Sequence, residues 1–407
     1  MQFGGYFVPT VYRSLAALIL LLPVSFCSSD SGEPPMVADP SISVSAVEFI
    51  EGNGDSNNTV DLVFELSTVS TKPVEFSYAT EGKSAVANED FEPASGAVII
   101  EPGTTSKSIS LSIIGDQHLE FDERYLVKVS NIVNATMVIS DIEITILDDD
   151  SFEPEQDADG FVTPIAYPSM ELAWSDEFDD VSINEADWNF EEGNGCPNLC
   201  GWGNAELQWY SVDNTQLDNG NMVITAENPS ENRYTSSRLT TKGKQEFKYG
   251  RIDIRAKLPF GRGIWPALWM LGTNIDDVGW PVCGEIDIME MVGHQAATVH
   301  GTAHYDVNGH QFTGNSRSLG SGIYADQFHI FTILWQPGQI EWFIDYSKFY
   351  TLNAKDVGFT YPFDAPFFFI ANVAVGGQWP GDPDATTQFP QTLEVDYIRV
   401  FQTAGLE

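Results

Sequence analysis

The chain has 407 residues and a formal net charge of -40, because 59 acidic residues face only 19 lysines and arginines. Nucleic acids and anionic membranes are bound through basic surfaces, so we exclude both as direct partners. The charge also argues against a polyanionic substrate. The length allows two domains. All ten tryptophans lie between Trp174 and Trp379, which indicates that the domain type changes along the chain.

The N-terminus has the pattern of an export signal. Arg13 precedes the apolar run Leu15–Val24, which is too short to span a bilayer as a stable helix. We expect a signal over residues 1–27 and a polar tether over residues 28–40. Cys27 resembles the lipidated cysteine of a bacterial lipoprotein, although Phe26 replaces the small residue that processing prefers; ordinary secretion is the alternative. Either route exports the protein, to the cell envelope or the medium, with membrane contact only through a lipid anchor.

Residues 41–150 alternate between short strand patterns and turn residues, as in a small immunoglobulin-like β-sandwich. The expected strands are Ile42–Ser45, Val60–Leu66, Val74–Tyr78, Ala97–Ile100, Ser108–Ile114, Tyr125–Val129 and Ile142–Leu147. Residues 151–170 carry acids and prolines without periodicity, which predicts a linker.

Acidic residues gather at the strand ends of this first domain. They are Glu51, Asp116, Glu120, Glu123, Asp148, Asp149 and Asp150. Carboxylates clustered at one tip of a sandwich form a site for a hard cation, and Ca²⁺ is the natural occupant. An acidic tip without an ion is the alternative. The segment resembles the Calx-beta domain, whose calcium positions these residues match, except that Gly82 stands where that family has an aspartate.

Residues 171–403 are again rich in strand patterns and show no long amphipathic helix, which predicts a two-sheet β-jelly roll with a curved face. An oxidising compartment would allow Cys196 and Cys200, four residues apart, to form a disulfide. Cys283 is then expected as a buried thiol.

Three carboxylates fall within six residues of an otherwise apolar strand. Strand alternation puts Glu285 and Asp287 on one face and Glu290 on the other, but a β-bulge between Asp287 and Glu290 brings all three together. Like charges so placed cost folding free energy, which indicates function. Glutamates on one face can lean to the roughly 5–5.5 Å between carboxyls of a retaining glycosidase. A solvated acidic edge is the alternative, disfavoured by the interleaved isoleucines and methionines.

A hairpin adds a histidine to these acids. A turn at residues 293–296 would make Glu290 and Thr298 partners and place His304 roughly opposite Glu285. We therefore predict an active-site role for His304 and a structural one for His300, which falls further along the strand.

A sugar-binding cleft needs exposed aromatic side chains, because sugar rings present apolar C–H faces. Trp265, Trp269, Trp280 and Trp379 flank a proline or lie in loops and are the candidates. In contrast, Trp174, Trp188, Trp335 and Trp342 lie in strand patterns and are expected in the core.

Five motifs in order resemble glycoside hydrolase family 16, and within it the bacterial laminarinases, which are endo-1,3-β-glucanases. They are Asn204–Tyr210, Gly261–Met270, Glu285–Glu290, His300–Tyr305 and Val375–Gly381. The likeness covers about residues 172–401 and implies a concanavalin-like jelly roll. The acidic strand has the bulged E-x-D-x-x-E form rather than the shorter form of lichenases.

The resemblance implies roles for individual residues. Glu285 matches the nucleophile and Glu290 the acid/base, while Asp287 shares a proton with Glu285. Arg238 and Asn204 match positions that hydrogen-bond sugar hydroxyls. A second group, Glu177, the backbone of Gly220, and Asp396, matches a structural calcium site on the convex face. No cofactor is implied for catalysis.

The resulting hypothesis is a monomeric, exported, retaining endo-hydrolase of neutral 1,3-β-glucan. One alternative keeps the fold and changes the polysaccharide to mixed-linkage glucan, agar or carrageenan; sulfated galactans fit poorly with so few basic residues. The other alternative is a non-catalytic carbohydrate-binding protein, which would be expected to have lost one of the two glutamates.

Overall fold

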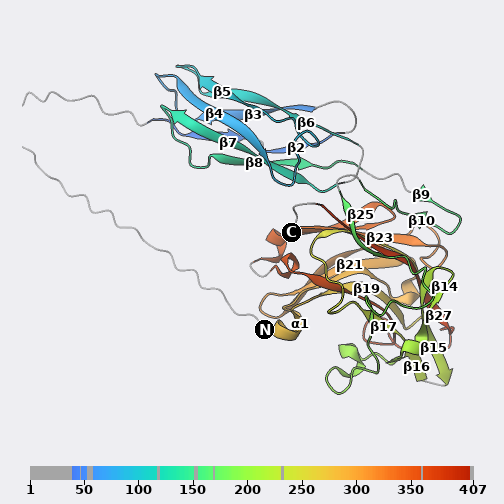
Figure 1. The fold of residues 1–407 in the computed structure, drawn as a ribbon. Helices are drawn as coiled ribbons and strands as arrows, with labels where there is room; N and C mark the ends of the chain where they lie inside the picture. Colours follow the sequence, from blue (N-terminus) through green and yellow to red (C-terminus); the bar gives the residue numbers. More distant parts are fainter. Residues whose placement is uncertain are drawn as a thin grey trace, which may run out of the picture. The chain divides into compact units, whose positions relative to one another are not determined.

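The computed structural model describes residues 39–403 except 46, 53–57, 117–119, 151–154, 168–169, 231–232 and 359–360. The expected export signal, with Cys27, and nearly all of the tether lie outside the described residues. Within the described ranges no helix is both long and apolar enough to cross a membrane. Strands dominate both domains (Figure 1).

The first domain is a sandwich of two sheets, as predicted. One sheet has three strands in the order β1 (Ile42–Ser45), β3 (Asn58–Leu66), β6 (Ser106–Ile113). The other has five, in the order β2 (Glu48–Ile50), β8 (Asp141–Leu147), β7 (Glu123–Val133), β4 (Val74–Gly82), β5 (Ser95–Ile100). Alternate apolar residues of both sheets, such as Leu62, Phe64, Val127 and Ile144, form one buried core.

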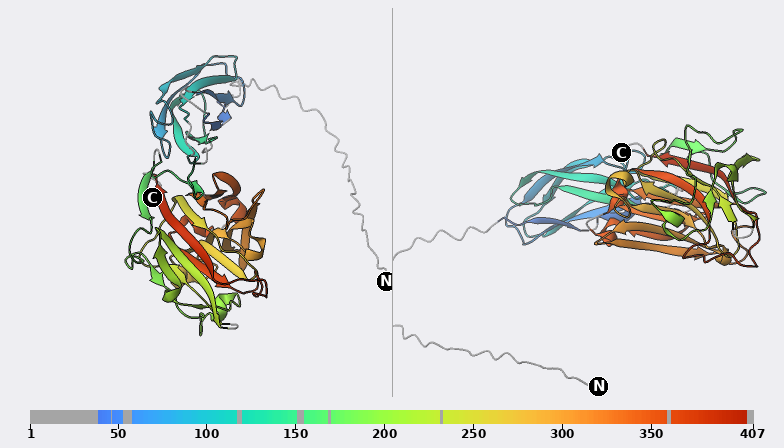
Figure 2. Two further views of the ribbon diagram at one scale, coloured as in Figure 1. Left: turned by 90° about the vertical axis from the view of Figure 1, so that its right-hand side faces the viewer. Right: turned by 90° about the horizontal axis from the view of Figure 1, so that it is seen from below.

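The second domain consists of two larger sheets, which the two views of Figure 2 show as stacked layers of strands. A ten-stranded sheet runs β13 (Trp209–Tyr210), β16 (Arg233–Ser236), β15 (Asn221–Ser230), β27 (Gln391–Gln402), β18 (Gly250–Lys257), β23 (His329–Gln336), β24 (Gln339–Ile344), β25 (Ser347–Asn353). Beside this path, β11 (Glu171–Asp176) pairs with β27 and β14 (Thr215–Asp218) pairs with β15.

A seven-stranded sheet carries the predicted catalytic strand. Its order is β12 (Asn189–Phe190), β17 (Arg238–Thr240), β26 (Phe367–Val375), β19 (Ile264–Gly272), β20 (Glu285–Glu290), β21 (Thr298–Asp306), β22 (His310–Ser318). The helices are short: α1 (Ile275–Val278), α2 (Ala354–Val357), and the 3-10 turns η1 (Cys200–Gly203), η2 (Val212–Asn214), η3 (Gly293–Gln295) and η4 (Pro362–Asp364).

One face of the seven-stranded sheet is buried against the ten-stranded sheet. In β21, Val299, Ala303 and Tyr305 are buried and alternate with half-buried polar residues. Strand alternation therefore directs His300 and His304 to the opposite face. Trp188, Trp335 and Trp342 are fully buried and Trp174 packs against the same core, which confirms the prediction for these four tryptophans.

The predicted linker over residues 151–170 is wrong for residues 155–167, which are built into the second domain. Here β9 (Glu155–Gln156) pairs with β10 (Phe161–Val162). Asp157 accepts a hydrogen bond of 2.9 Å from Arg255, and the Tyr167 hydroxyl donates one of 2.6 Å to Asp253. The composition was a poor guide because Asp157 pairs with Arg255, which lies about a hundred residues further along the chain.

The anchoring of Tyr167 predicts a measurable contribution to stability. This side chain is 5% exposed and stacks edge-on against Phe401 at 4.7 Å. Tyr167→Ala should cost about 3–5 kcal/mol, as for other buried aromatics, and lower the Tm in a thermal melt by about 6–15 °C. Ile165→Ala, at a position that is 77% exposed, is the matched control and should change the Tm by no more than about 1–2 °C. Equal effects would contradict the anchoring.

Candidate active site

Strand β20 contains the bulge that the sequence predicts. Its pairing with β21 shifts register between Asp287 and Glu290, and its pairing with β19 shifts between Leu268 and Trp269. The extra residue makes both Ile288 and Met289 face the core. Asp287 and Glu290 consequently share the outer face of the sheet with Glu285.

The three acids lie in a poorly solvated environment. Asp287 is 3% exposed, and Glu285 and Glu290 are half-buried. Burial raises the pKa of each carboxyl to about 8, and the charge of Asp287 adds to the increase at both glutamates. Such carboxyls can hold protons near neutral pH, which is the property that general acid catalysis requires.

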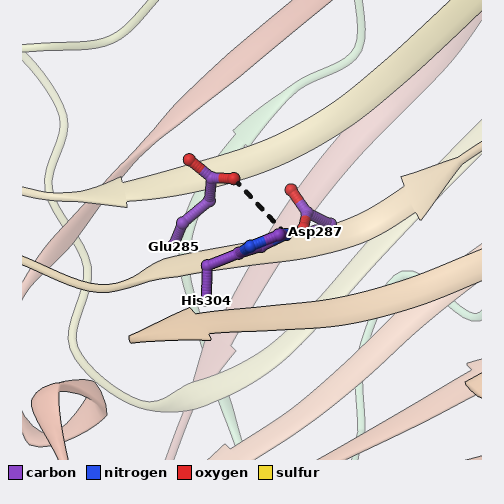
Figure 3. Close-up of side chains that lie close together, drawn as sticks. All are labelled: Glu285, Asp287 and His304. Atoms are coloured by element: carbon purple, nitrogen blue, oxygen red, sulfur yellow. Dashed lines mark ion pairs between the residues drawn. The ribbon is translucent and has the colours of Figure 1, made fainter. Parts of the chain in front are cut away.

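His304 lies opposite Glu285 in the pairing of β21 with β20, as the hairpin predicts. Its Nε2 is 3.1 Å from Oδ2 of Asp287 and 3.7 Å from Oε1 of Glu285. Figure 3 shows the three side chains converging from two neighbouring strands. A positive charge on His304 lowers the pKa of Glu285 and thus favours its ionised form.

The predicted position of His300 is wrong. Glu290 pairs with His300 rather than with Thr298, because the bulge and the turn η3 move the register by two residues. The ring of His300 meets Trp379 edge-on at 5.0 Å. His300 therefore belongs to the face that carries the acids, and burial lowers its pKa.

Each glutamate accepts a hydrogen bond from a tryptophan. Trp280 Nε1 donates to Oε2 of Glu285 at 3.1 Å, and Trp265 Nε1 donates to Oε1 of Glu290 at 3.1 Å. Trp280 is 47% exposed. Trp379, 42% exposed, packs edge-on against Trp265 at 5.5 Å. These three predicted sugar-binding tryptophans line the face that carries the three acids.

The fourth, Trp269, acts with the predicted Arg238. The Arg238 guanidinium lies between two indole rings, 4.6 Å from the centroid of Trp202 and 4.9 Å from that of Trp269. Its Nε donates a short hydrogen bond to Glu191. Trp202 was missed in the sequence, although it stands between two glycines, each of positive φ, two residues after the loop that the Cys196–Cys200 disulfide closes. That disulfide is confirmed, and Cys283 is a buried free thiol.

Asn204 donates a hydrogen bond of 3.2 Å to Oε1 of Glu206. The other Glu206 oxygen accepts from Gln208 at 2.7 Å and from the Tyr210 hydroxyl at 3.3 Å. Burial raises the pKa of Glu206. Glu206 was not predicted, although it lies in the motif of Asn204, so this carboxylate positions the residue that the sequence singled out.

Two further side chains near His304 were also missed, namely His310 and Phe312 on β22. Phe312 is 68% exposed, and its ring lies 5.7 Å from that of His304. The signal was present, because Asn308-Gly309 is a strong hairpin turn that returns the chain to His304. A hollow of about 280 Å³ next to these residues is lined by His300, Thr302, Phe312, Gly314, Asn315 and Ser316.

The acids at the tip of the first domain form two groups. One contains Glu51, Asp148 and Asp150, and the other contains Asp90, Glu120 and Glu123. Within each group the ligand atoms lie within 4.8 Å of one another. Burial raises the pKa of Glu51 to about 8 and of Asp148 to about 7. Desolvated carboxylates so close together fit a divalent cation. Asp90 was missed. Asp116 and Asp149 act through other contacts: the Asp116 N–H donates to Glu51, and Asp149 accepts from the Gly52 N–H.

The predicted calcium site on the convex face (Glu177, the backbone of Gly220, and Asp396) stays a prediction, and both of its acids contact arginines. The carboxylate of Glu177 forms two hydrogen bonds with Arg399, at 2.9 and 2.7 Å. The carboxylate of Asp396 accepts from Arg255 at 2.6 Å. Among the described residues neither acid belongs to a group of three or more His, Cys, Asp or Glu side chains within reach of one ion, although this site would also use the backbone of Gly220. The sequence match identified the acids but not the distant arginines that neutralise them.

Comparisons with known proteins agree with this geometry. The family model of glycosyl hydrolases family 16 matches residues 203–399, and that of the Calx-beta domain matches residues 54–150. A beta-glucanase of Rhodothermus marinus is 42% identical over 254 residues, covering 58% of this chain and 86% of the relative. The chain belongs to glycosyl hydrolase family 16. It also carries the Calx-beta domain that its first segment predicts.

Solved structures of the family resemble the second domain. The laminarinase catalytic domain of Thermotoga maritima has 50% sequence identity and a TM-score of 0.54, covering 57% of this chain and 98% of that one. The endo-beta-1,3-glucanase of Pyrococcus furiosus has 44% identity and a TM-score of 0.54, covering 57% and 94%. The jelly roll of family 16 is thus confirmed.

The raised pKa values predict how stability depends on pH. The Glu290 carboxyl has a pKa of about 8 in the folded protein and about 4.5 in the unfolded chain. Between about pH 4.5 and pH 8, the folded protein therefore keeps this proton and the unfolded chain loses it. Stability therefore falls as pH rises through this window. Glu290→Gln removes the titrating group and therefore this loss of stability. It should raise the Tm by about 2–6 °C at pH 8 but by little at pH 4.

The matched control is the exposed Glu227. Glu227→Gln should change the Tm similarly at both pH values. Thermal melts in the same buffers provide the measurement, and a Glu290→Gln effect that is equal at pH 4 and pH 8 would contradict the assigned shift.

Proposed function

We propose that this chain hydrolyses internal bonds of neutral 1,3-β-glucan with retention of configuration at the anomeric carbon. The observation that carries the proposal is the bulged strand, which puts Glu285 and Glu290 on one face. Each of the two glutamates accepts a tryptophan N–H, and Asp287 lies between them in the strand, in contact with His304 of the neighbouring strand. The laminarinases among the similar structures support the choice of substrate.

Glu285 is the nucleophile. Its Oε2 accepts the N–H of Trp280, and its Oε1 faces His304. Both contacts oppose the rise of the Glu285 pKa to about 8 that burial and the charge of Asp287 cause, so they stabilise the carboxylate that attacks the anomeric carbon. The C–O bond to the leaving sugar breaks as the bond to Glu285 forms, giving a glycosyl-enzyme.

Glu290 is the acid and then the base. Its raised pKa allows it to hold a proton at neutral pH and to give it to the leaving glycosidic oxygen. The resulting carboxylate then removes a proton from the water that attacks the glycosyl-enzyme, which releases Glu285.

Asp287 is the buried neighbour of both glutamates. Its charge raises the pKa values of Glu285 and Glu290, and burial raises its own. Two carboxyls so close cannot both ionise cheaply, so a proton held on Asp287 allows Glu285 to be charged. No metal or organic cofactor takes part in this scheme.

The surroundings of the acids favour an uncharged polymer. Trp280, Trp379 and Phe312 present exposed apolar surface for sugar faces. Arg238 is paired with Glu191 and covered by two indoles, so it offers N–H donors to hydroxyls rather than an unbalanced positive charge to sulfates. This disfavours carrageenan-type substrates.

The stereochemical course is the direct test. Inversion would need carboxyls roughly 6.5–9.5 Å apart to admit a water. The placing of Glu285 and Glu290 on one face of the same bulged strand disfavours this. Proton NMR during the first minutes of laminarin digestion should show β-anomeric reducing ends before mutarotation. Glu285→Ala should be inactive and should regain turnover with azide, giving the α-glycosyl azide; initial release of the α-anomer by the unmodified enzyme would overturn the assignment.

Mixed-linkage glucan and agarose, digested in parallel, decide the substrate. Cleavage of agarose but not laminarin would favour another polysaccharide of the same fold. Binding of laminarin without cleavage would favour a carbohydrate-binding protein. Glu290→Gln should lower the rate on the true substrate by about 10²–10⁴-fold, while leaving the circular dichroism spectrum unchanged.

We further propose that the tip of the Calx-beta domain binds Ca²⁺, and that the N-terminal signal exports the chain. The carboxylates of Glu51, Asp148 and Asp150, and of the group around Glu123, would hold the ion and be neutralised by it. Burial raises the pKa of Glu123 to about 11, so this tip is costly to ionise without a cation.

Calcium should therefore stabilise the first domain. Addition of about 100 Kd of Ca²⁺ should stabilise it by about 2.7 kcal/mol, seen as a higher Tm of the first transition in calorimetry of the full chain. Asp148→Asn should weaken this shift, whereas Asp61→Asn, on a sandwich strand away from the tip, should not. A Tm that Ca²⁺ leaves unchanged would contradict the proposal.

A further inference from the structure

His310 closes a ring of contacts around the proposed nucleophile. Its Nε2 is 2.8 Å from Nδ1 of His304, and its ring lies 4.4 Å from that of Trp280. His304 and Trp280 in turn face the two oxygens of Glu285, at 3.7 and 3.1 Å. Both groups that fix the Glu285 carboxylate are thus held by one further side chain.

The contact between the two imidazoles restricts where protons can lie. A nitrogen–nitrogen separation of 2.8 Å is a hydrogen bond and holds one proton. When both rings are neutral, His304 can present an N–H to Asp287 and Glu285 only through Nε2, and its Nδ1 must then accept from the Nε2–H of His310. The pair can take up one more proton, but not two, because two N–H groups would then face each other.

The other contact of His310 restrains Trp280. This indole is 47% exposed and lies outside the regular strands, between α1 and β20. The hydrogen bond from Trp280 to Glu285 requires the ring in one orientation. Packing against the tip of the β21–β22 hairpin, where His310 is the first residue of β22, limits the alternatives.

Few charged groups face His310. His304 lies beside it, and Asp306 is its partner in the hairpin, with a carboxylate that accepts the Gly309 N–H. Trp280 and Phe312 pack against it as uncharged rings, and the rest of the imidazole is exposed. The catalytic acids Glu285 and Asp287 reach His310 only through His304.

We propose that His310 is a positioning residue for the nucleophile: it fixes the His304 tautomer that presents Nε2–H to Glu285 and Asp287, and it supports the indole that donates to the other Glu285 oxygen. The inference rests on the proposed glycosidase function for its kinetic effect. The arrangement of the two histidines can be tested without any substrate.

Two substitutions separate the two contacts. His310→Phe keeps a ring against Trp280 but removes the hydrogen bond to His304, whereas His310→Gln restores an N–H donor. We expect His310→Phe to lower kcat on laminarin about tenfold, as the loss of one hydrogen bond implies, with KM within twofold. His310→Gln should remain within threefold of the unmodified enzyme, and His294→Ala, which removes an exposed histidine of η3, should have no effect.

The route through His304 is tested by a double variant. If His310 acts by orienting His304, adding His310→Phe to His304→Ala should lower kcat no further, because the two residues are coupled. The pH profile of kcat should change its acidic limb in His310→Phe but not in His294→Ala. Additive losses, or a change in KM alone, would overturn the proposal.

Nitrogen-15 NMR of the imidazoles provides the readout without substrate. His304, assigned by its absence in His304→Ala, should be a single Nε2–H tautomer in the unmodified protein and a mixture in His310→Phe. An unchanged tautomer would overturn the role of His310 even if glucan is cleaved. Failure to cleave any glucan would overturn the proposed function, and the NMR result would still decide whether His310 orients His304.

Discussion

The face that carries the three acids depends on one irregularity, the bulge in β20 between Asp287 and Glu290. Without the extra residue, strand alternation would direct Glu290 into the core, where Met289 and Ile288 now pack. The bulge is matched by a shift in β19, so both neighbouring strands accommodate it. All contacts of the site, from the tryptophan N–H groups to the histidine pair, presuppose this register.

Sequence reasoning was successful where the information is local. The bulge, the position of His304 and the Cys196–Cys200 disulfide follow from spacing within one strand, one hairpin or one loop. It was wrong for His300, because a short turn and a bulge together move register by amounts that alternation alone does not give. The Asn308-Gly309 turn before His310 is visible in the sequence, and it predicts that the returning strand passes His304.

The other errors concern charge pairs between distant segments. Arg255 pairs with Asp157 and Asp396, which lie on either side of it in sequence by about a hundred residues or more. No periodicity reports such a pairing, so an anchored segment was taken for a linker, and the arginine partner of the predicted metal ligand Asp396 was not foreseen. In an acid-rich chain the few arginines decide which carboxylates are available for other roles.

The guanidinium of Arg238 lies between two indole rings and is tied to Glu191. Two aromatic rings therefore pack against it, and its side chain loses rotational freedom during folding rather than on binding. Its remaining N–H groups point in directions fixed by the plane between the indoles. A sugar hydroxyl approaching there would meet a preorganised donor, and the angle of the ring would then be selected as much as its polarity.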